Sequence, residues 1–562
     1  MPSVRPRLRS ARRIAVTAVS AALLATMAAA CSSSSSSSSA SGASSSPAAS
    51  TSASGAPVSG GTLTWALAED PLSIDPWGGG SGNDQLYVTR QIFDTLIEQD
   101  PTTGQLLPFL ASSWSSNASA TQFKFTLRSG VTFSNGEALT AQDVASNFAA
   151  IVKQGATASW VADDFIGYKS TTVTGPLTFT VNFSVPDGAF IQQLSGVDIV
   201  APSTLAIPYQ DWASGKGVIG SGPFVLQSYT PGQSVILTRR AGYDWGPSDR
   251  TNQGAAYLNE IDFKITPEDS VRTGVLTSGQ VDAIDNVNPT DVSTLQSDGY
   301  DVLTRANPGI AFSLTFVQNS PITEDLQVRE AIADAIDPTA IRDAVLNSDY
   351  AVATSILSND TVGYVNLSKD LTYNQTEAEK LLSADGWVTG SNGIREKGGK
   401  QLSLTLGWIN NFAPNENALE LLQAELKQVG VQVSLETGTV PQYLADLESG
   451  KFNLAWGNLS NSNAAVLREQ FASSGSDYYK LDDPTLNQDF AEEYGTSSQS
   501  AQDQYAAAAQ ERILQEYYAV PVFQLTTILA TSKSVHGVEF GADSRLAQLT
   551  DAWVSGSGTV NG

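Results

Sequence analysis

The pattern of apolar and polar positions predicts a strand, a turn and a helix in the first third of the chain. Residues 123–127 alternate between apolar and polar side chains, and a Ser-Gly turn separates them from an alternating segment at 131–133. Alternation with period two is typical of strands that bury one face, so we expect a hairpin here. Thr140 and Asp143 resemble a capping box, and residues 144–151 then repeat apolar side chains at helical spacing.

The start of the folded part predicts a strand followed by a helix. Residues 61–67 have the composition of a short buried strand, and a glycine-rich run follows at 78–80. We expect Asn83 or Asp84 to cap the next helix. Four apolar residues fall on one face of that predicted helix: Leu86, Phe93, Leu96 and Ile97.

The second half of the chain alternates between strand and helix patterns. The segments are a strand at 402–406, a helix at 416–429, a strand at 431–435, a helix at 443–447 and a strand at 452–456. An order of β-α-β-α-β predicts an α/β fold, in which helices pack on a parallel or mixed sheet.

Two loops follow strands of this sheet, at 407–412 and 457–463. Ligands of open α/β sheets bind beyond the carboxyl ends of the strands, so we interpret these loops as a ligand surface. Tryptophan beside neutral amides suits an uncharged polar solute with some apolar surface. Taken singly, each tryptophan could instead belong to the core and each asparagine to a turn. The candidate residues are Trp408, Asn410, Asn411, Trp456, Asn458 and Asn463.

The first 60 residues have the character of an export signal rather than a fold. Five arginines precede an uncharged apolar run at 14–30, which ends in three alanines before Cys31. This order matches a signal peptide over residues 1–30, and Cys31 resembles the acylated cysteine of a bacterial lipobox. The Ser-rich segment 31–59 predicts a flexible tether. We therefore expect an extracytoplasmic protein held at the outer face of a membrane by a lipid on Cys31.

Composition narrows the range of functions. The 562 residues contain 57 acids and 31 bases, and a net charge of −26 disfavours a nucleic-acid partner. The one cysteine and the one histidine, His536, exclude clustered-thiol and multi-histidine metal sites, so we expect no metal and no cofactor.

A secreted hydrolase with two catalytic carboxylates is the rival function from another class. Adjacent acids in polar stretches are usually solvated, and the sequence has no GxSxG motif, so we expect no enzyme. The pairs that the rival would use are Asp163-Asp164, Asp482-Asp483 and Glu492-Glu493.

Seven segments, in their order and spacing, resemble the extracytoplasmic solute-binding proteins of ABC importers, in the peptide/nickel-binding family. The resemblance extends over residues 60–555. The segments lie at 92–114 (IFDTLIEQDPTTGQLLPFLASSW), 123–148, 220–246, 278–285 (SGQVDAID), 328–341, 378–387 and 518–523 (YAVPVF).

The resemblance implies a two-lobed periplasmic-binding-protein-like fold, with mixed sheets flanked by helices and a cleft between the lobes. By resemblance, lobe I takes residues 60–97, 206–310 and 526–562, and an extra subdomain of lobe I takes 98–205. Lobe II takes 311–525, and the chain crosses between the lobes near 307–312 and 523–529. Asn83 and Tyr87, after the glycine-rich run, are the candidate contacts from lobe I.

The resemblance also implies a monomer that closes around a solute and delivers it to a permease with its ATPase subunits. Peptide-binding relatives pair an aspartate with the ligand's α-amino group, and that position falls on Ser462 or Asn463 here. Residues 456–467 contain no acid, so a neutral polar solute, a blocked peptide or an oligosaccharide stays open beside an ordinary peptide. A surface sensor with the same fold is a further alternative.

Overall fold

The computed structural model describes residues 55–78, 80–474 and 477–556, which belong to one compact unit beginning at residue 53. The predicted signal peptide, Cys31 and the tether as far as residue 54 lie outside the described residues. No helix among the residues described is both long and apolar enough to span a membrane.

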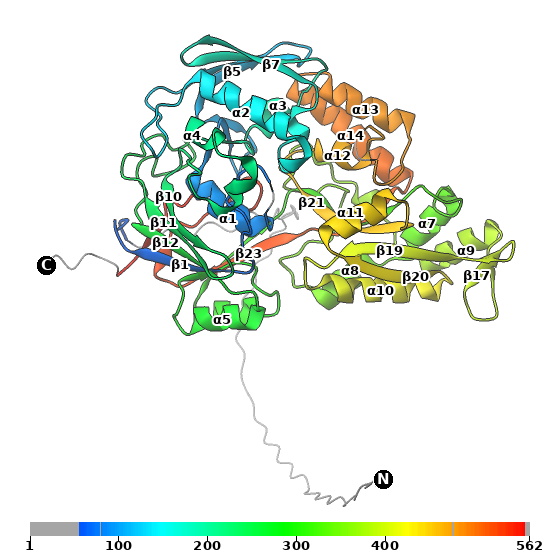
Figure 1. Cartoon of the computed structure of the whole chain (residues 1–562). Coiled ribbons are helices and arrows are strands. Elements are labelled where there is room, and N and C mark those ends of the chain that lie inside the picture. The colour runs from blue at the N-terminus through cyan, green and yellow to red at the C-terminus, as the bar shows by residue number, and fades with distance from the viewer. Residues whose placement is uncertain (1–54, 79, 475–476, 557–562) are drawn as a thin grey trace, which may run out of the picture. The chain divides into compact units, whose positions relative to one another are not determined.

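A seven-stranded sheet unites three separate stretches of the chain (Figure 1). Strand β1 is parallel to both of its neighbours, β12 and β13, while the other pairs are antiparallel. The order of the strands is β10 (Phe224–Thr230), β11 (Ser234–Arg239), β12 (Glu260–Ile265), β1 (Thr62–Leu67), β13 (Ala283–Ile284), β23 (Thr526–Thr531) and β14 (Asp301–Ala306). The strand predicted at 61–67 is thus confirmed as β1.

A five-stranded mixed sheet forms from the second half, as the β-α-β-α-β pattern predicts. Strand β19 is parallel to β20 and β21, whereas β15 is antiparallel to β21 and β22. The order is β20 (Gln432–Gly438), β19 (Ser403–Ile409), β21 (Leu454–Ser460), β15 (Gly309–Phe316) and β22 (Ala519–Phe523). The predicted helices are α10 (Asn415–Gln428) and α11 (Val440–Glu448).

A four-stranded antiparallel sheet packs against helix α2 (Ala141–Gln154) through a cluster of phenylalanine rings. Thr140 and Asp143 form the predicted capping box. The predicted hairpin is wrong, because β6 pairs with β5 and β8, and Thr132 makes only an isolated bridge with Ala138. The strands are β5 (Ala111–Ser116), β6 (Gln122–Leu127), β8 (Thr178–Phe183) and β7 (Tyr168–Gly175).

Helix α1 (Asn83–Ile92) is shorter than the apolar pattern predicts. Phe93 is already extended, with φ −118° and ψ 156°, and the chain then pairs β2 (Asp94–Thr95) with β9 (Asp198–Ile199). Phe93, Leu96 and Ile97 are buried from this extended segment rather than from a helical face. The predicted side-chain cap is also wrong. Gly82 is the N-cap, at a φ of 104° that favours glycine.

The remaining elements cover and connect the sheets. The helices are α3 (Phe190–Gln193), α4 (Pro202–Leu205), α5 (Asp269–Thr277), α6 (Val292–Ser297), α7 (Leu326–Asp334), α8 (Pro338–Val345), α9 (Gln375–Ala384), α12 (Val466–Phe471), α13 (Pro484–Tyr494) and α14 (Gln499–Gln515). Short 3₁₀ turns are η1 (Gly155–Thr157), η2 (Asp163–Phe165), η3 (Tyr209–Ser214) and η4 (Ser368–Asp370). Minor strands are β3 (Ile97–Gln99), β4 (Leu106–Pro108), β16 (Val388–Thr389), β17 (Arg395–Lys397), β18 (Lys400–Gln401), β24 (Val535–His536) and β25 (Trp553–Val554).

Candidate functional site

The carboxyl ends of β19 and β21 meet at one edge of the five-stranded sheet. The two strands are parallel, and Trp408 is in register with Trp456. The loops that follow them therefore emerge side by side, which is the arrangement that the sequence predicts for a ligand surface. We call this region the second edge.

The two tryptophans of the second edge belong to the core. Both strands run further than the sequence predicts, so Trp408 lies within β19 rather than in a loop, while Trp456 lies within β21, in the strand predicted at 452–456. Trp408 is 4% exposed and Trp456 is 2% exposed. The Trp456 indole N–H donates to the Asn415 side-chain oxygen at 3.0 Å, and its ring stacks on Phe312. In this structure the indole rings support the two loops and offer them no free aromatic surface.

Three asparagines of the second edge have free amides. Asn410 and Asn411 are exposed and Asn458 is half-buried. The side chains of all three make no hydrogen bond to any other residue within the described ranges. Asn463 differs from them, because it is buried and its side-chain oxygen accepts from the Ala465 amide at 2.5 Å, as in a turn. The second edge therefore presents neutral donors and acceptors that are not yet engaged.

The seven-stranded sheet has a corresponding edge where the parallel strands β1 and β13 end, which we call the first edge. Asp285 follows β13, and its carboxylate accepts from the Ala68 amide at 2.9 Å, directly after β1. The Arg272 guanidinium lies 3.9 Å from the same carboxylate oxygen. Asp84, at the start of α1, accepts from the Glu69 amide. Asp84 and Asp285 are both almost fully buried.

The two buried carboxyl groups of the first edge are electrostatically coupled. Burial raises the pKa of Asp84 well above its usual value, and the negative charge of Asp285 and the hydrogen bond that the two groups share raise it further. Burial also raises the pKa of Asp285, although the hydrogen bond to Asp84 and the charge of Arg272 oppose that shift. Like charges at such close range favour one proton shared by the pair.

The lobe I candidates, Asn83 and Tyr87, lie on α1 beside this pair. Tyr87 is 1% exposed, and burial together with the charges of Asp285 and Asp84 raises its pKa. The Asn83 side-chain oxygen accepts from Arg545 at 2.6 Å, and Arg545 also contacts Asp543 at 3.1 Å. Asn83 is thus engaged within the protein, and Tyr87 is buried beside the acid pair.

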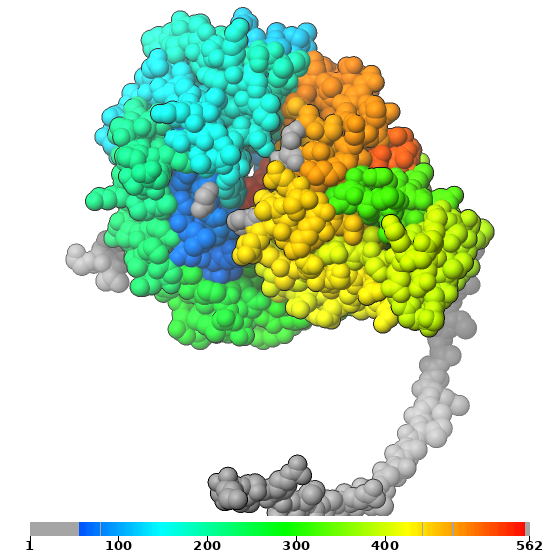
Figure 2. All heavy atoms as spheres, turned by 45° about the vertical axis from the view of Figure 1, so that its right-hand side comes forward, coloured from blue at the N-terminus to red at the C-terminus, as the bar shows by residue number. Residues whose placement is uncertain are grey.

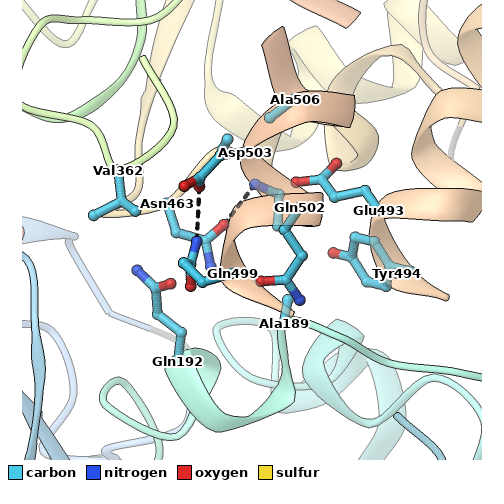
Figure 3. A pocket seen from close by; sticks show the side chains of 12 residues that line it. Ala189, Gln192, Val362, Asn463, Glu493, Tyr494, Gln499, Gln502, Asp503 and Ala506 are labelled. Carbon is cyan, nitrogen blue, oxygen red and sulfur yellow. Dashed lines mark hydrogen bonds between the residues drawn. The ribbon is translucent and has the colours of Figure 1, made fainter. Parts of the chain in front are cut away.

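Figure 2 shows a hollow in the surface between the blue residues that include α1 and the yellow residues that include α11. A small, partly open cavity of about 20 Å³ lies where the segment around Ala189 and Gln192 meets Asn463 and helix α14 (Figure 3). It has room for about one water molecule. Within the described ranges no group of three or more His, Cys, Asp or Glu residues is arranged to hold a metal ion.

One acid pair of the hydrolase alternative, Asp482-Asp483, has a structural role in the fold. Asp483 caps α13 by accepting from the Thr485 and Leu486 amides, and it pairs with Arg512 at 2.8 Å. Burial alone would raise its pKa, but the Leu486 amide, Arg512 and Tyr518 together lower it. Asp482, its neighbour in the sequence, is exposed. This pair is thus one helix cap and one surface acid.

Sequence reasoning missed the acidic character of the first edge. Asp84 was expected only as a helix cap, and Asp285 entered only as part of a family segment at 278–285. The sequence did contain a signal, because Asp285 directly follows a pair of apolar residues. An acid next to a buried apolar pair is rare unless its carboxylate has a partner. Its partner could not be read from the sequence, since Ala68 and Asp285 are separated by 217 positions.

The chain belongs to the bacterial extracellular solute-binding proteins, family 5, whose sequence model matches residues 105–477. It is therefore an extracytoplasmic solute-binding protein with the two-lobed α/β fold of that family.

Curated relatives and solved structures extend over most of the chain. The nickel-binding periplasmic protein of Escherichia coli K12 is 24% identical over 85% of this chain and 93% of its own length. The dipeptide-binding protein of the same organism is 24% identical over 76% of this chain and 82% of its own length. The oligopeptide-binding protein AppA of Bacillus subtilis, in complex with a nonapeptide, superposes with a TM-score of 0.73 at 19% identity, covering 89% of this chain and all of AppA. NikA from Brucella suis, in complex with Fe(III)-EDTA, gives 0.75 at 21% identity, covering 88% of this chain and all of NikA.

Proposed function

We propose that the protein captures a polar, peptide-like or other uncharged solute between its lobes and delivers it to an ABC permease with its ATPase subunits. Family membership supports the capture, and the names of the relatives support peptides and metal complexes as solute classes. In this proposal lobe I comprises 60–97, 206–310 and 526–562, its subdomain 98–205, and lobe II 311–525. Closure about the two crossings between lobes would enclose the solute.

The free amides of the second edge carry the proposed choice of solute. Asn410, Asn411 and Asn458 would bind the solute directly, because their hydrogen-bonding capacity is unused and lies at one sheet edge. Trp408 and Trp456 would act by fixing the loops that hold these amides. No acid stands between residues 456 and 467 to compensate a buried ammonium group, which favours neutral groups over a free peptide N-terminus.

Anchoring and oligomeric state complete the proposal. Cys31, acylated after removal of residues 1–30, would attach the protein to the outer face of the cell membrane, and the Ser-rich tether would let a monomer reach the permease. Incorporation of labelled palmitate into the wild-type chain, and its loss in Cys31→Ser, would test the anchor. A sensor function would leave solute binding intact without any permease partner.

A melting-temperature screen of residues 53–562 tests the solute class. A ligand that binds only the folded state raises the melting temperature by mass action. The panel contains peptides with free and with blocked N-termini, oligosaccharides and Ni²⁺. We expect a rise with blocked peptides or oligosaccharides that exceeds the rise with free peptides. A rise with free peptides alone would overturn the neutral-solute proposal, and turnover of any panel member would favour the hydrolase alternative.

A further inference from the structure

A contact outside the two crossings joins the subdomain segment to the helices of the second half. The Gly188 amide donates to the Tyr494 carbonyl at 2.8 Å, and the Gln502 side chain donates to the Gly188 carbonyl at 2.8 Å. The Gln192 side chain donates to the Ser462 carbonyl at 3.4 Å, beside the small cavity of Figure 3. Both backbone groups of Gly188 are thus satisfied by the other half of the molecule.

The approach at Gly188 leaves no room for a side chain. A Cβ at this position would lie 2.3 Å from the Thr496 carbonyl oxygen and 2.5 Å from the Gln502 amide nitrogen. Separations of this kind are not tolerated between non-bonded atoms, so the contact requires glycine here. The contact is therefore closely fitted, and an opening that separates these two segments would break it.

Two carboxyl groups are buried on either side of this contact. Asp187, next to Gly188, is 4% exposed, and Glu493, next to Tyr494, is 6% exposed. Asp187 Oδ1 and Glu493 Oε2 have no hydrogen-bond partner among the residues that the structure describes. A buried ionised oxygen without a partner is costly, whereas a protonated carboxyl group is much less so.

We propose that this contact is a proton-sensitive latch, which holds the two halves together when Asp187 and Glu493 are protonated and releases them when both ionise. The inference rests on the proposed closure between the lobes and adds a control of that closure by pH. It explains why an acid with an unpartnered oxygen is buried on each side of this contact. A purely structural contact would gain more from neutral side chains at these positions.

The surroundings of Asp187 and Glu493 favour their protonated forms while the contact is closed. Burial raises the pKa of Asp187 to about 7, against the opposing charge of Arg468 and the amides of Ala189 and Phe190. Burial raises the pKa of Glu493 to about 8, with Arg468 opposing and Asp503 reinforcing the shift. Water would reach both carboxyl groups in an open form and return each pKa towards its ordinary value.

The raised pKa values of Asp187 and Glu493 make closure depend on pH. Both pKa values are higher in the closed form than in the open form, so the closed form binds more protons between the ordinary values and about pH 8. Closure is therefore favoured as the pH falls and becomes less favourable as it rises, reaching a constant level above about pH 8. Each proton taken up on closure changes the closed-to-open ratio about ten-fold per pH unit.

The charged groups around the latch come from every element that packs against it, and most are acidic. The Arg468 guanidinium lies 3.8 Å from the centre of the Tyr494 ring, but within the described ranges it makes no ion pair with either acid. The groups are Asp163 and Asp164 on η2, Asp187 before α3, Arg468 and Glu469 on α12, Glu493 and Tyr494 on α13, and Asp503 on α14.

Distance measurements between spin labels test the latch without any solute. Residues 53–562 form a compact unit and contain no cysteine, so Thr172→Cys and Gln488→Cys, both at exposed positions, place one label on each side. We expect the population with the shorter distance to grow at least ten-fold relative to the longer one between pH 8 and pH 5. An unchanged distribution over this range would overturn the latch.

Substitutions test whether Asp187 and Glu493 cause the pH dependence of the distance. In Asp187→Asn with Glu493→Gln we expect the short-distance population to stay high at pH 8 and to lose its pH dependence. Asp482→Asn, a charge removed from an exposed position just before α13, should titrate like the wild type. Gly188→Ala should open the contact at every pH, and Gly242→Ala, with open space around its Cβ position, should not. Titration of the double acid variant like the wild type would contradict the proposal.

The same measurements separate this inference from the proposed function. Solute-induced shortening that is independent of pH would retain closure and reject the latch. A pH-dependent distance in a protein that binds no member of the solute panel would retain the latch and reject the proposed solute. A single distance under all conditions would reject both.

Discussion

The first and second edges occupy equivalent places in their sheets but have opposite chemistry. Each lies beyond the carboxyl ends of parallel strands, yet the first edge contains buried acids that already accept backbone amides of the protein. The second edge contains neutral amides on exposed or half-buried side chains, with their hydrogen bonds unmade. Topology thus determines where a ligand surface can form, and the hydrogen bonds that the polar groups already make determine which surface is free to bind a ligand.

We expect the greatest loss of stability from truncating a tryptophan in the core of the second edge. Trp456→Ala removes a ring that is 2% exposed and stacked on Phe312, so it should lower the free energy of unfolding by about 3–5 kcal/mol. Urea denaturation measures the loss. Trp456→Phe, which keeps most of the ring contact, should lose markedly less. Loss of solute affinity at unchanged stability in Trp456→Ala would instead make the indole a direct contact.

The next largest loss of stability should follow from removing a buried acid of the first edge. Asp285→Ala leaves the Ala68 amide without its acceptor and Arg272 without a nearby buried charge, so we expect a loss of about 3 kcal/mol in the free energy of unfolding. Asp285→Asn keeps an acceptor oxygen and should lose less. Equal stability of the alanine variant and the wild type would show that the first edge is not held by this carboxylate.

A smaller effect concerns Asp75, further along the loop that follows β1. Burial raises its pKa to about 6, against hydrogen bonds from Tyr209 and the Trp77 amide. The folded state therefore binds the proton more tightly than the unfolded state, and this group's contribution to stability falls as the pH rises through 4 to 6. Asp75→Asn should be more stable than the wild type by about 1–2 kcal/mol at pH 8, with no difference below pH 4. Thermal unfolding at several pH values measures this, and an advantage that persists at pH 4 would contradict it.

Substitutions of the free amides should change stability least but weaken solute binding clearly. Asn410→Ala, Asn411→Ala and Asn458→Ala remove no hydrogen bond within the protein, so each should change the free energy of unfolding by less than about 0.5 kcal/mol. Each should weaken solute binding by about five- to ten-fold in a titration, the equivalent of one hydrogen bond. Gln296→Ala on α6, which removes an exposed neutral amide outside the second edge without a side-chain hydrogen bond in the described ranges, is the matched control. Unchanged affinity in all three variants would move the binding surface elsewhere.

Local patterns predicted the elements that are encoded by neighbouring residues. The capping box at Thr140 and the alternation before it are local signals, and the corresponding helix and strand are present. The predicted helix through Phe93 to Ile97 was wrong, because residues buried by an extended chain can mimic a helical spacing. The loops at 407–412 and 457–463 were placed correctly at one edge, but β19 and β21 extend into them, so Trp408 lies in a strand and, like Trp456, in the core.

Residue type and periodicity are local properties, and they were enough to identify the family, the β-α-β-α-β order of the second half and the neutral composition of the loops at its strand ends. Which polar groups are already paired depends, in contrast, on the tertiary structure. The Ala68–Asp285 and Gln502–Gly188 hydrogen bonds join residues 217 and 314 positions apart. The path of the chain between the sheets brings these partners together, and short-range periodicity contains no information about that path.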